Sequence, residues 1–274
     1  VSAAVAYELA DNTGGRFRLG LGSQVKAHIE RRYSAEFDRP AARLRDYVQA
    51  VQACWRAFNR EERLAHDGEF YQMSLLPRDW SPKAHDHPMK VDISAVGPIM
   101  TRVAGEVADG VHVHPLHSMP YIENRLKPDL AKGAAKAGRS VDDIDLIIPV
   151  YACPGDTPEE REPYVAHAKR QIAFYGSTPN YAFQFDDLGY EGTTQRIRAK
   201  MKAGDLDTLG DEITDEMLNQ YGLMTNWDDM ADQLLARYKG TASRVVMYLG
   251  TQMIRTDDRH LGKWAEVARA VRNG

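Results

Sequence analysis

The alternation of apolar strands with amphipathic helices predicts an α/β fold with parallel strands. Segments near residues 16, 91, 111, 144 and 243 resemble strands, and helix-like sequence separates each from the next. Strands connected through helices form right-handed crossovers, so this order predicts one parallel sheet covered by helices. Five strands are too few to close an eight-stranded barrel. The residues alone therefore leave open a five-stranded open sheet or a barrel with three further βα units upstream.

Residues 91–115 form the clearest strand–helix–strand unit of the chain. Gly97 allows the backbone to approach a ligand closely, and Pro98 suits the first position of a helix. Gly110 is expected to end that helix. One helical face is apolar: Met100, Val103, Ala104, Val107 and Ala108. The amides at the helix start predict an anion-binding site.

The other elements follow from periodicity and from Gly and Pro positions. Helices are predicted over residues 1–10, 39–58, 121–137 and 158–175, strands over 16–22, 91–96, 111–116, 144–153 and 244–249, a Pro-containing excursion over 68–88, and a mostly helical insertion over 177–222. The clearest amphipathic helix is 39–58. Residues 225–228 resemble a capping box before a last helix over 230–238.

Composition limits the classes of function. The chain has 274 residues and a formal net charge of −4, which gives no electrostatic basis for binding nucleic acid or an anionic membrane. No apolar run has the length that crosses a bilayer, so we expect a cytoplasmic protein. Cys54 and Cys153 are expected to be buried, reduced thiols.

Four segments together resemble the luciferase-like monooxygenase superfamily, in particular its coenzyme F420-dependent oxidoreductases. They are GGRFRLGLGSQVKAHIERRYS, the helix 39–58 followed by HDGEFYQM, SAVGPIMTRVAGEVADGVHVHP, and MTNWDDMADQLLARY before SRVVMYLG. The resemblance implies a TIM (β/α)8 barrel of the bacterial luciferase-like type. Residues 1–274 would then form one domain that lacks the first three strands, with residues 177–222 as a helical lid over the pocket.

The resemblance implies a deazaflavin or flavin ring at the carboxyl ends of the strands. Its phosphate would lie on the loop after the fifth family strand, formed by Ser94, Ala95, Val96, Gly97 and Pro98, with Met100 in the first helical turn. Ser23 and Gln24 would reach the ring edge from the loop after the fourth strand. Lys26, with the nearby basic residues His28, Arg31 and Arg32, would meet the acidic tail of F420. A plain βα turn and a solvated basic loop are the alternatives.

Three histidines at one strand end suggest two different chemistries. His112 and His114 share a strand face, and with His117 they resemble the paired imidazoles of metal-dependent barrel hydrolases. The later strands, however, offer no further histidine. In the oxidoreductase hypothesis, His112 borders the ring and His114 is the catalytic donor or acid. A hydrogen-bonded histidine at the barrel mouth is the structural alternative.

Aromatic residues gather in the insertion, where they could form a substrate site or simply pack the insertion onto the barrel. They are Tyr175, Tyr181, Phe183, Phe185 and Tyr190.

The sequence therefore predicts an oxidoreductase that transfers a hydride between F420 and a small organic substrate, without bound metal. The alternatives are an FMN-dependent monooxygenase, a metal-dependent hydrolase using His112 and His114, and a non-catalytic truncated relative. A homodimer is expected from the resemblance, and nucleic acid and membrane are not expected partners.

Overall fold

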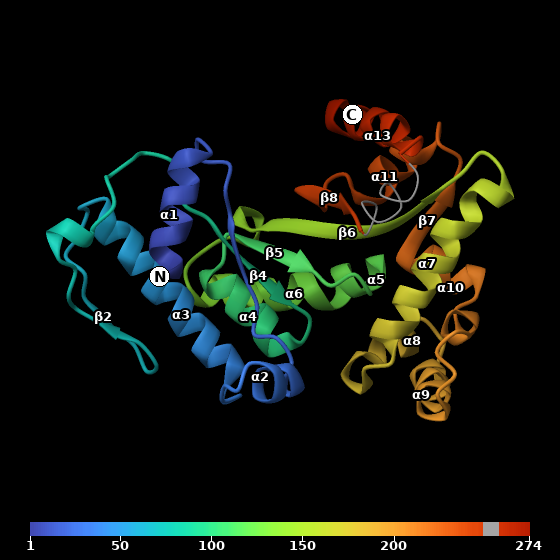
Figure 1. Ribbon diagram of the computed structural model, residues 1–274, viewed down its shortest axis with the longest axis horizontal. Helices are drawn as coiled ribbons and strands as arrows, with labels where there is room; N and C mark the ends of the chain where they lie inside the picture. Colours follow the sequence, from blue (N-terminus) through green and yellow to red (C-terminus); the bar gives the residue numbers. More distant parts are fainter. Residues whose placement is uncertain (249–257) are drawn as a thin grey trace. The chain divides into compact units, whose positions relative to one another are not determined.

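The computed structural model describes residues 1–248 and 258–274, in which strands and helices alternate along the chain (Figure 1). The chain divides into two compact units, Val1–His112 with Arg125–Asp145 and Val113–Asn124 with Leu146–Gly274. The strands pair in parallel in each unit, apart from one small hairpin. The predicted α/β class is therefore confirmed.

The sheet of the first unit begins with β1 (Leu19–Leu21) beside β4 (Val91–Ala95), and β5 (Gly110–Val113) follows β4 in the strand order. Leu19 lies opposite Val91. The strand is therefore shorter than the predicted range 16–22. Its start is lost because the pairing with β4 begins only at Val91.

Five helices accompany this sheet: α1 (Ser2–Asn12), α2 (Lys26–Arg32), α3 (Pro40–Phe58), α4 (Pro98–Val107) and α6 (Lys127–Lys136). The apolar face predicted for residues 39–58 is confirmed, since Leu44, Val48 and Val51 are buried along α3. Trp55 on the same helix donates from its indole Nε1 to the carbonyl oxygen of Ala3, 2.9 Å away, and so connects α3 to α1.

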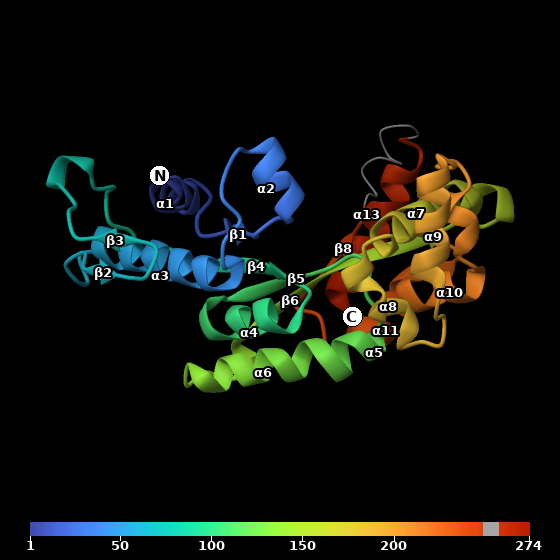
Figure 2. The ribbon, with the colours of Figure 1, turned by 90° about the horizontal axis from the view of Figure 1, so that it is seen from below.

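Helices α4 and α6 lie side by side at very short range (Figure 2). A Cβ atom added to Gly105 would overlap the carbonyl oxygen of Leu130, and one added to Gly133 would overlap that of Arg102. Only glycine allows the two backbones to come so close.

The end of α4 differs from the prediction. The helix ends at Val107, and Gly110 is already the first residue of β5. Asp109 explains the early stop: its amide donates to the carbonyl oxygen of Val91 at 2.7 Å, and its carboxylate accepts from the amide of Val91 at 2.8 Å. The predicted strand over 111–116 is also shorter, since a proline at 115 cannot donate to a ladder.

Between α3 and β4 the chain forms the hairpin of β2 (His66–Asp67) and β3 (Gln72–Met73) and the short helix η1 (Arg78–Trp80), so the excursion predicted over 68–88 begins slightly earlier, at β2. The buried carboxylate of Asp46 on α3 holds the hairpin. It accepts from the amides of Phe70 and Tyr71 at 2.6 and 3.1 Å and contacts Nε2 of His66 at 2.6 Å.

The second unit is built on the long strand β6 (Asp145–Pro154), whose first residue belongs to the first unit. Strand β8 (Arg244–Met247) pairs with residues 147–150 of β6, and β7 (Gly222–Thr225) pairs with residues 151–154. The sequence did not predict β7. Gly222 marks its start, because a Cβ there would lie 2.6 Å from the carbonyl oxygen of Tyr151.

Helices make up most of the remaining structure. They are α5 (Met119–Tyr121), the π-helix η2 (Ile122–Leu126), η3 (Val141–Asp143), α7 (Pro158–Gly176), η4 (Pro179–Tyr181), α8 (Phe183–Asp186), α9 (Thr193–Ala203), η5 (Leu209–Glu212), α10 (Asp215–Tyr221), α11 (Met230–Tyr238) and α13 (His260–Asn273). The predicted insertion over 177–222 is helical, with α8, α9 and α10 inside it.

The capping box predicted at residues 225–228 is wrong. Thr225 is the last residue of β7, and α11 begins at Met230 with Asp229 as its N-cap. Asn226 instead forms the turn between them, because its side-chain oxygen accepts from the amide of Asp229 at 2.8 Å. The last predicted strand ends at Met247, and its residue 249 lies outside the described residues.

Both cysteines are buried and free, as predicted. None of the helices in residues 1–248 and 258–274 has the length and apolar character required to cross a membrane.

Candidate active site

Two loops of the first unit meet where neighbouring parallel strands end. Gly22 follows β1, and a Cβ atom on it would lie 3.6 Å from the Cβ of Ser94 near the end of β4. The carboxyl ends of parallel strands share one edge of a sheet, which is where ligands bind in α/β proteins. The structure thus brings the two predicted cofactor loops together.

The turn after β4 leaves the start of α4 open. Gly97 is the N-cap in an extended conformation (φ −80°, ψ 158°) and Pro98 is the first helical residue, as predicted. No side chain caps the helix, and its first turn carries no acidic residue. A Cβ on Gly97 would meet no atom within 4 Å, so neither packing nor backbone geometry requires glycine there.

Several predicted residues accompany this turn. Ser94 is exposed, Ala95 is buried, Val96 and Met100 are half-buried, and Ile99 between Pro98 and Met100 is 68% exposed. The amides at an open helix start carry a partial positive charge, so this turn can bind an anion through its backbone.

The loop after β1 is shaped by local hydrogen bonds. Gln24 adopts a left-handed backbone conformation (φ 54°), and its side-chain oxygen accepts from the amide of Val25 at 2.9 Å. The side-chain NH2 group of Gln24 remains as a hydrogen-bond donor for a ligand. The hydroxyl of Ser23 lies 3.4 Å from the carbonyl oxygen of Gln24. Lys26 begins α2 with 67% of its side chain exposed and lies 3.6 Å from Glu30.

His112 lies against a buried carboxylate on the sheet. Its Nε2 is 3.4 Å from Oδ2 of Asp92, and Arg18 donates from Nε to the same oxygen at 2.8 Å. Burial alone would raise the pKa of Asp92, but hydrogen bonds from His112 and Arg18 and the charge of Arg18 lower it to about 2. Arg18 also contacts Asp145 at 2.8 Å. His112 therefore belongs to a charged cluster that was not predicted from the sequence. An aspartate at position 92, inside an otherwise apolar strand, is the signal that could have indicated it.

His114 lies in the second unit between Tyr175 of α7 and Tyr181 of η4. Its ring centroid is 4.8 Å from that of Tyr175 and 4.7 Å from that of Tyr181. The Nδ1 atom accepts from the amide of Leu116 at 3.1 Å, which leaves the proton on Nε2. Burial lowers the pKa of His114 to about 4, so the ring is neutral at pH 7. It can donate a hydrogen bond but is not a cationic acid there.

Two further tyrosines extend this cluster. The hydroxyls of Tyr175 and Tyr248 are 2.5 Å apart, and the rings of Tyr248 and Tyr151 pack edge to face at 5.5 Å. The Tyr151 hydroxyl is buried and has no hydrogen-bond partner among the described residues. Burial raises the pKa of both Tyr151 and Tyr248. Unsatisfied buried hydroxyls are uncommon, and this one marks a place where a ligand atom could bind.

The aromatic residues of the insertion divide into two groups. Tyr175 and Tyr181 contact His114, whereas Phe185 is fully buried against Tyr221 and packs the insertion itself. Phe183 contacts Tyr121, and the hydroxyl of Tyr190 contacts Glu216. The first pair could line a substrate site, and the rest have structural roles.

His117 is buried and plays a structural part. Its Nδ1 donates to the carbonyl oxygen of His114 at 2.9 Å, and burial lowers its pKa to about 4. Within residues 1–248 and 258–274, no three His, Cys, Asp or Glu side chains are grouped as metal ligands. The hydrolase alternative thus lacks a ligand set in this part of the chain.

Comparison with known proteins identifies the family. A family model described as luciferase-like monooxygenase matches residues 1–244. An uncharacterized protein of Mycobacterium tuberculosis is 34% identical over 247 residues, which are 90% of this chain and 73% of that protein. The F420-dependent glucose-6-phosphate dehydrogenase of Nocardia farcinica is 34% identical over 152 residues, covering 53% of this chain and 42% of that enzyme.

Solved structures share the fold. The coenzyme F420-dependent tetrahydromethanopterin reductase of Methanopyrus kandleri matches with a TM-score of 0.64 at 19% identity, covering 89% of this chain and 72% of that one. A 3,6-diketocamphane monooxygenase component of Pseudomonas putida, in complex with FMN, matches with a TM-score of 0.53 at 15% identity, covering 90% and 68%. The chain therefore belongs to the luciferase-like monooxygenase family.

Proposed function

We propose that this protein is a coenzyme F420-dependent oxidoreductase that transfers a hydride to or from a small organic substrate. Relatives and structural neighbours named as F420-dependent enzymes support the choice of cofactor. The observation that carries the proposal is the open start of α4 at Gly97.

The open helix start fits the phosphate of a cofactor. An uncapped N-terminus presents free amides and a partial positive charge, and no acidic side chain in the first turn opposes an anion. A Cβ atom on Gly97 would have no atom of the described residues within 4 Å, apart from its chain neighbours. Residues 94–98 and Met100 would hold the phosphate, and the loop with Ser23 and Gln24 would approach the same ligand from β1.

The charge of α2 favours F420 over FMN. Lys26, Arg31 and Arg32 lie on this exposed helix, and of these only Lys26 has a carboxylate nearby among the described residues. The acidic tail of F420 would give these cations a partner, whereas FMN ends at its phosphate. FMN remains the second candidate, because a structural neighbour binds it.

The bound deazaflavin would supply the hydride acceptor or donor, and the chain would orient the substrate. His114 is suited to this task. A neutral imidazole with its proton on Nε2 can donate a hydrogen bond to a substrate oxygen. Tyr175 and Tyr181 pack against the imidazole ring of His114 and hold it in place.

The test is a titration of the purified protein with F420 and with FMN, followed by absorbance and fluorescence. We expect F420 to bind with a micromolar or lower Kd and FMN to bind at least tenfold more weakly. Tighter binding of FMN would favour the monooxygenase alternative. Stoichiometric zinc without affinity for either cofactor would favour the hydrolase, and a protein that binds neither cofactor nor zinc would be a non-catalytic relative.

A further inference from the structure

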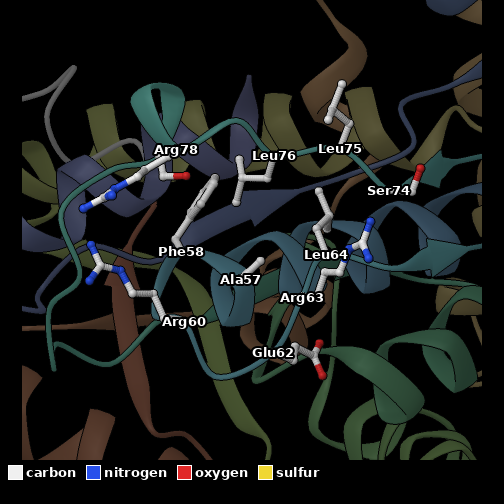
Figure 3. A pocket seen from close by; sticks show the side chains of 11 residues that line it. Ala57, Phe58, Arg60, Glu62, Arg63, Leu64, Ser74, Leu75, Leu76 and Arg78 are labelled. Carbon is white, nitrogen blue, oxygen red and sulfur yellow. The ribbon is translucent and has the colours of Figure 1, made fainter.

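A cavity at the carboxyl-terminal end of α3 lies apart from the proposed cofactor loops. It has a volume of about 630 Å³ and is lined by the last turn of α3, residues 60–64 and residues 74–81 (Figure 3). Small-molecule sites commonly measure about 300–1,000 Å³. Helix α3 has 19 residues. At ~1.5 Å per residue, the start of α3 is about 28 Å from this end.

The cavity carries unbalanced positive charge. Arg60, Arg63 and Arg78 line it, and within residues 1–248 and 258–274 none of the three has a carboxylate partner. Among the described residues that line the cavity, Glu62 is the one acidic side chain, and it is already paired with Arg56 through an Nε to Oε1 contact of 2.7 Å. Other arginines of the first unit, such as Arg18, Arg39 and Arg102, do have carboxylate partners.

The arginines stand beside an apolar surface. Phe58 and Leu64 are buried at the base, Leu76 is half-buried, and Leu75 at the rim is 81% exposed. Figure 3 shows the guanidinium groups of Arg60 and Arg78 on the same side of the cavity, with Phe58 and Leu76 next to them. The side with Arg60 and Arg78 is therefore cationic and adjoins the hydrocarbon of Phe58 and Leu76, whereas Arg63 lies on the opposite side beside Leu64.

The backbone places Arg60 at a position that usually selects another residue. Its φ is 62°, in the left-handed region that glycine or asparagine normally occupies after a helix. Hydrogen bonds from the amide of Arg60 to Ala57 and from that of Glu61 to Arg56 hold this turn. An arginine in this conformation keeps its side chain at the cavity at a cost in backbone energy.

We infer that this cavity binds an amphiphilic anion, a small molecule with a carboxylate or phosphate group on an apolar chain. Two guanidinium groups on one side can bind such a group through paired hydrogen bonds. Phe58, Leu64 and Leu76 would cover the chain. The inference does not depend on the proposed cofactor, because none of these residues belongs to the cofactor loops.

Calorimetric titration of the purified protein with decanoate and with decyl phosphate, below their micelle concentrations, tests the site. We expect saturable 1:1 binding of at least one of them. Binding of 1-decanol should be at least tenfold weaker, because it lacks the charge, and inorganic phosphate should also bind at least tenfold more weakly, because it lacks the chain. Equally tight binding of 1-decanol or of inorganic phosphate would overturn the inference that the cavity selects an amphiphilic anion.

Variants locate the site. Arg60→Gln and Arg78→Gln should each weaken the binding of the amphiphile at least tenfold, whereas Arg102→Gln, which removes an exposed arginine paired with Asp129 elsewhere in the unit, should not. Thermal unfolding checks that all three fold, and F420 affinity should be the same in each. Absence of amphiphile binding up to 1 mM, or equal weakening in all three variants, would overturn this inference and leave the cofactor proposal intact.

Discussion

Helices α4 and α7 begin alike but treat their first amides differently. Both follow a parallel strand and both have proline as their first residue. At α7, the hydroxyl of Thr157 accepts from the amide of Glu160 at 3.2 Å, and Glu159 and Glu160 add negative charge to the first turn. At α4, the N-cap Gly97 has no side chain that could accept a hydrogen bond, and the first turn carries no acidic residue.

The difference shows that the chain satisfies helix amides with its own oxygens at one strand end and leaves them available at the other. With glycine in place of a capping side chain, a helix start gives up about a few tenths of a kcal/mol of stability. A ligand anion that binds there would restore that stabilisation. The comparison thus assigns a structural start to α7 and agrees with the binding role that we propose for the start of α4.

The largest expected effect comes from giving α4 a cap of its own. Gly97→Asp should weaken F420 binding about 100-fold, roughly 2.7 kcal/mol, because its carboxylate would occupy and repel the anion site. The free energy of unfolding should remain equal or rise by about a few tenths of a kcal/mol, since aspartate is a slightly better N-cap than glycine. Fluorescence titration and urea denaturation measure the two quantities. Unchanged affinity would remove the cofactor phosphate from this turn.

The second prediction contrasts this backbone site with the side chains around His114. Burial lowers the pKa of His114 from 6.5 to about 4. Between those values the unfolded chain binds a proton that the folded chain does not, so the free energy of unfolding falls as the pH drops from 6.5 to 4. In His114→Gln, the slope in this window should decrease by up to about 1.4 kcal/mol per pH unit.

Urea denaturation at several pH values measures that slope. Gly97→Ala is the matched control, because it changes a site without a titrating side chain and should keep the slope of the unchanged protein. An equal slope in His114→Gln would show that this histidine is not desolvated in the folded state.

The third prediction concerns the capped helix. Thr157→Ala should lower the free energy of unfolding by about 1 kcal/mol, because the amide of Glu160 loses its acceptor. F420 affinity should not change. A loss of affinity with no loss of stability would reverse the roles assigned to the two helix starts.

The smallest effect is expected at α2. Lys26 is largely exposed and lies near Glu30, so Lys26→Gln should weaken F420 binding by only about twofold to threefold, in line with the small energies of exposed charges. The loss should shrink further in 0.5 M salt, as fluorescence titration would show. An equal loss of FMN affinity in Lys26→Gln would indicate that Lys26 contacts the phosphate of the cofactor rather than the acidic tail of F420.

Local features of the fold could be predicted from sequence. The apolar face of α3 and the Gly97-Pro98 helix start depend on neighbouring residues and helical periodicity, and both are found as expected. Strand β7 was missed because it has four residues and follows a helix without a break, so only its pairing with β6 defines it.

The surroundings of the histidines could not be predicted, because they depend on contacts between distant segments. Tyr175 and Tyr181 reach His114 from more than 60 residues away, and Asp92 meets Arg18 across 74 residues. Residue type indicated that His112 and His114 are notable, but only the fold shows that one pairs with a carboxylate and the other is shielded by aromatic rings.

The close approach of α4 and α6 at Gly105 and Gly133 has a consequence for the turn at Gly97. Two turns of helix join Gly97 to Gly105, and an α-helix transmits a displacement along its axis with little bending. A change in the distance between the two backbones at Gly105 would therefore also move the first amides of α4. Any side chain at Gly105 or Gly133 would push the helices apart. The position of the proposed anion site would thus depend on two residues that no ligand would touch.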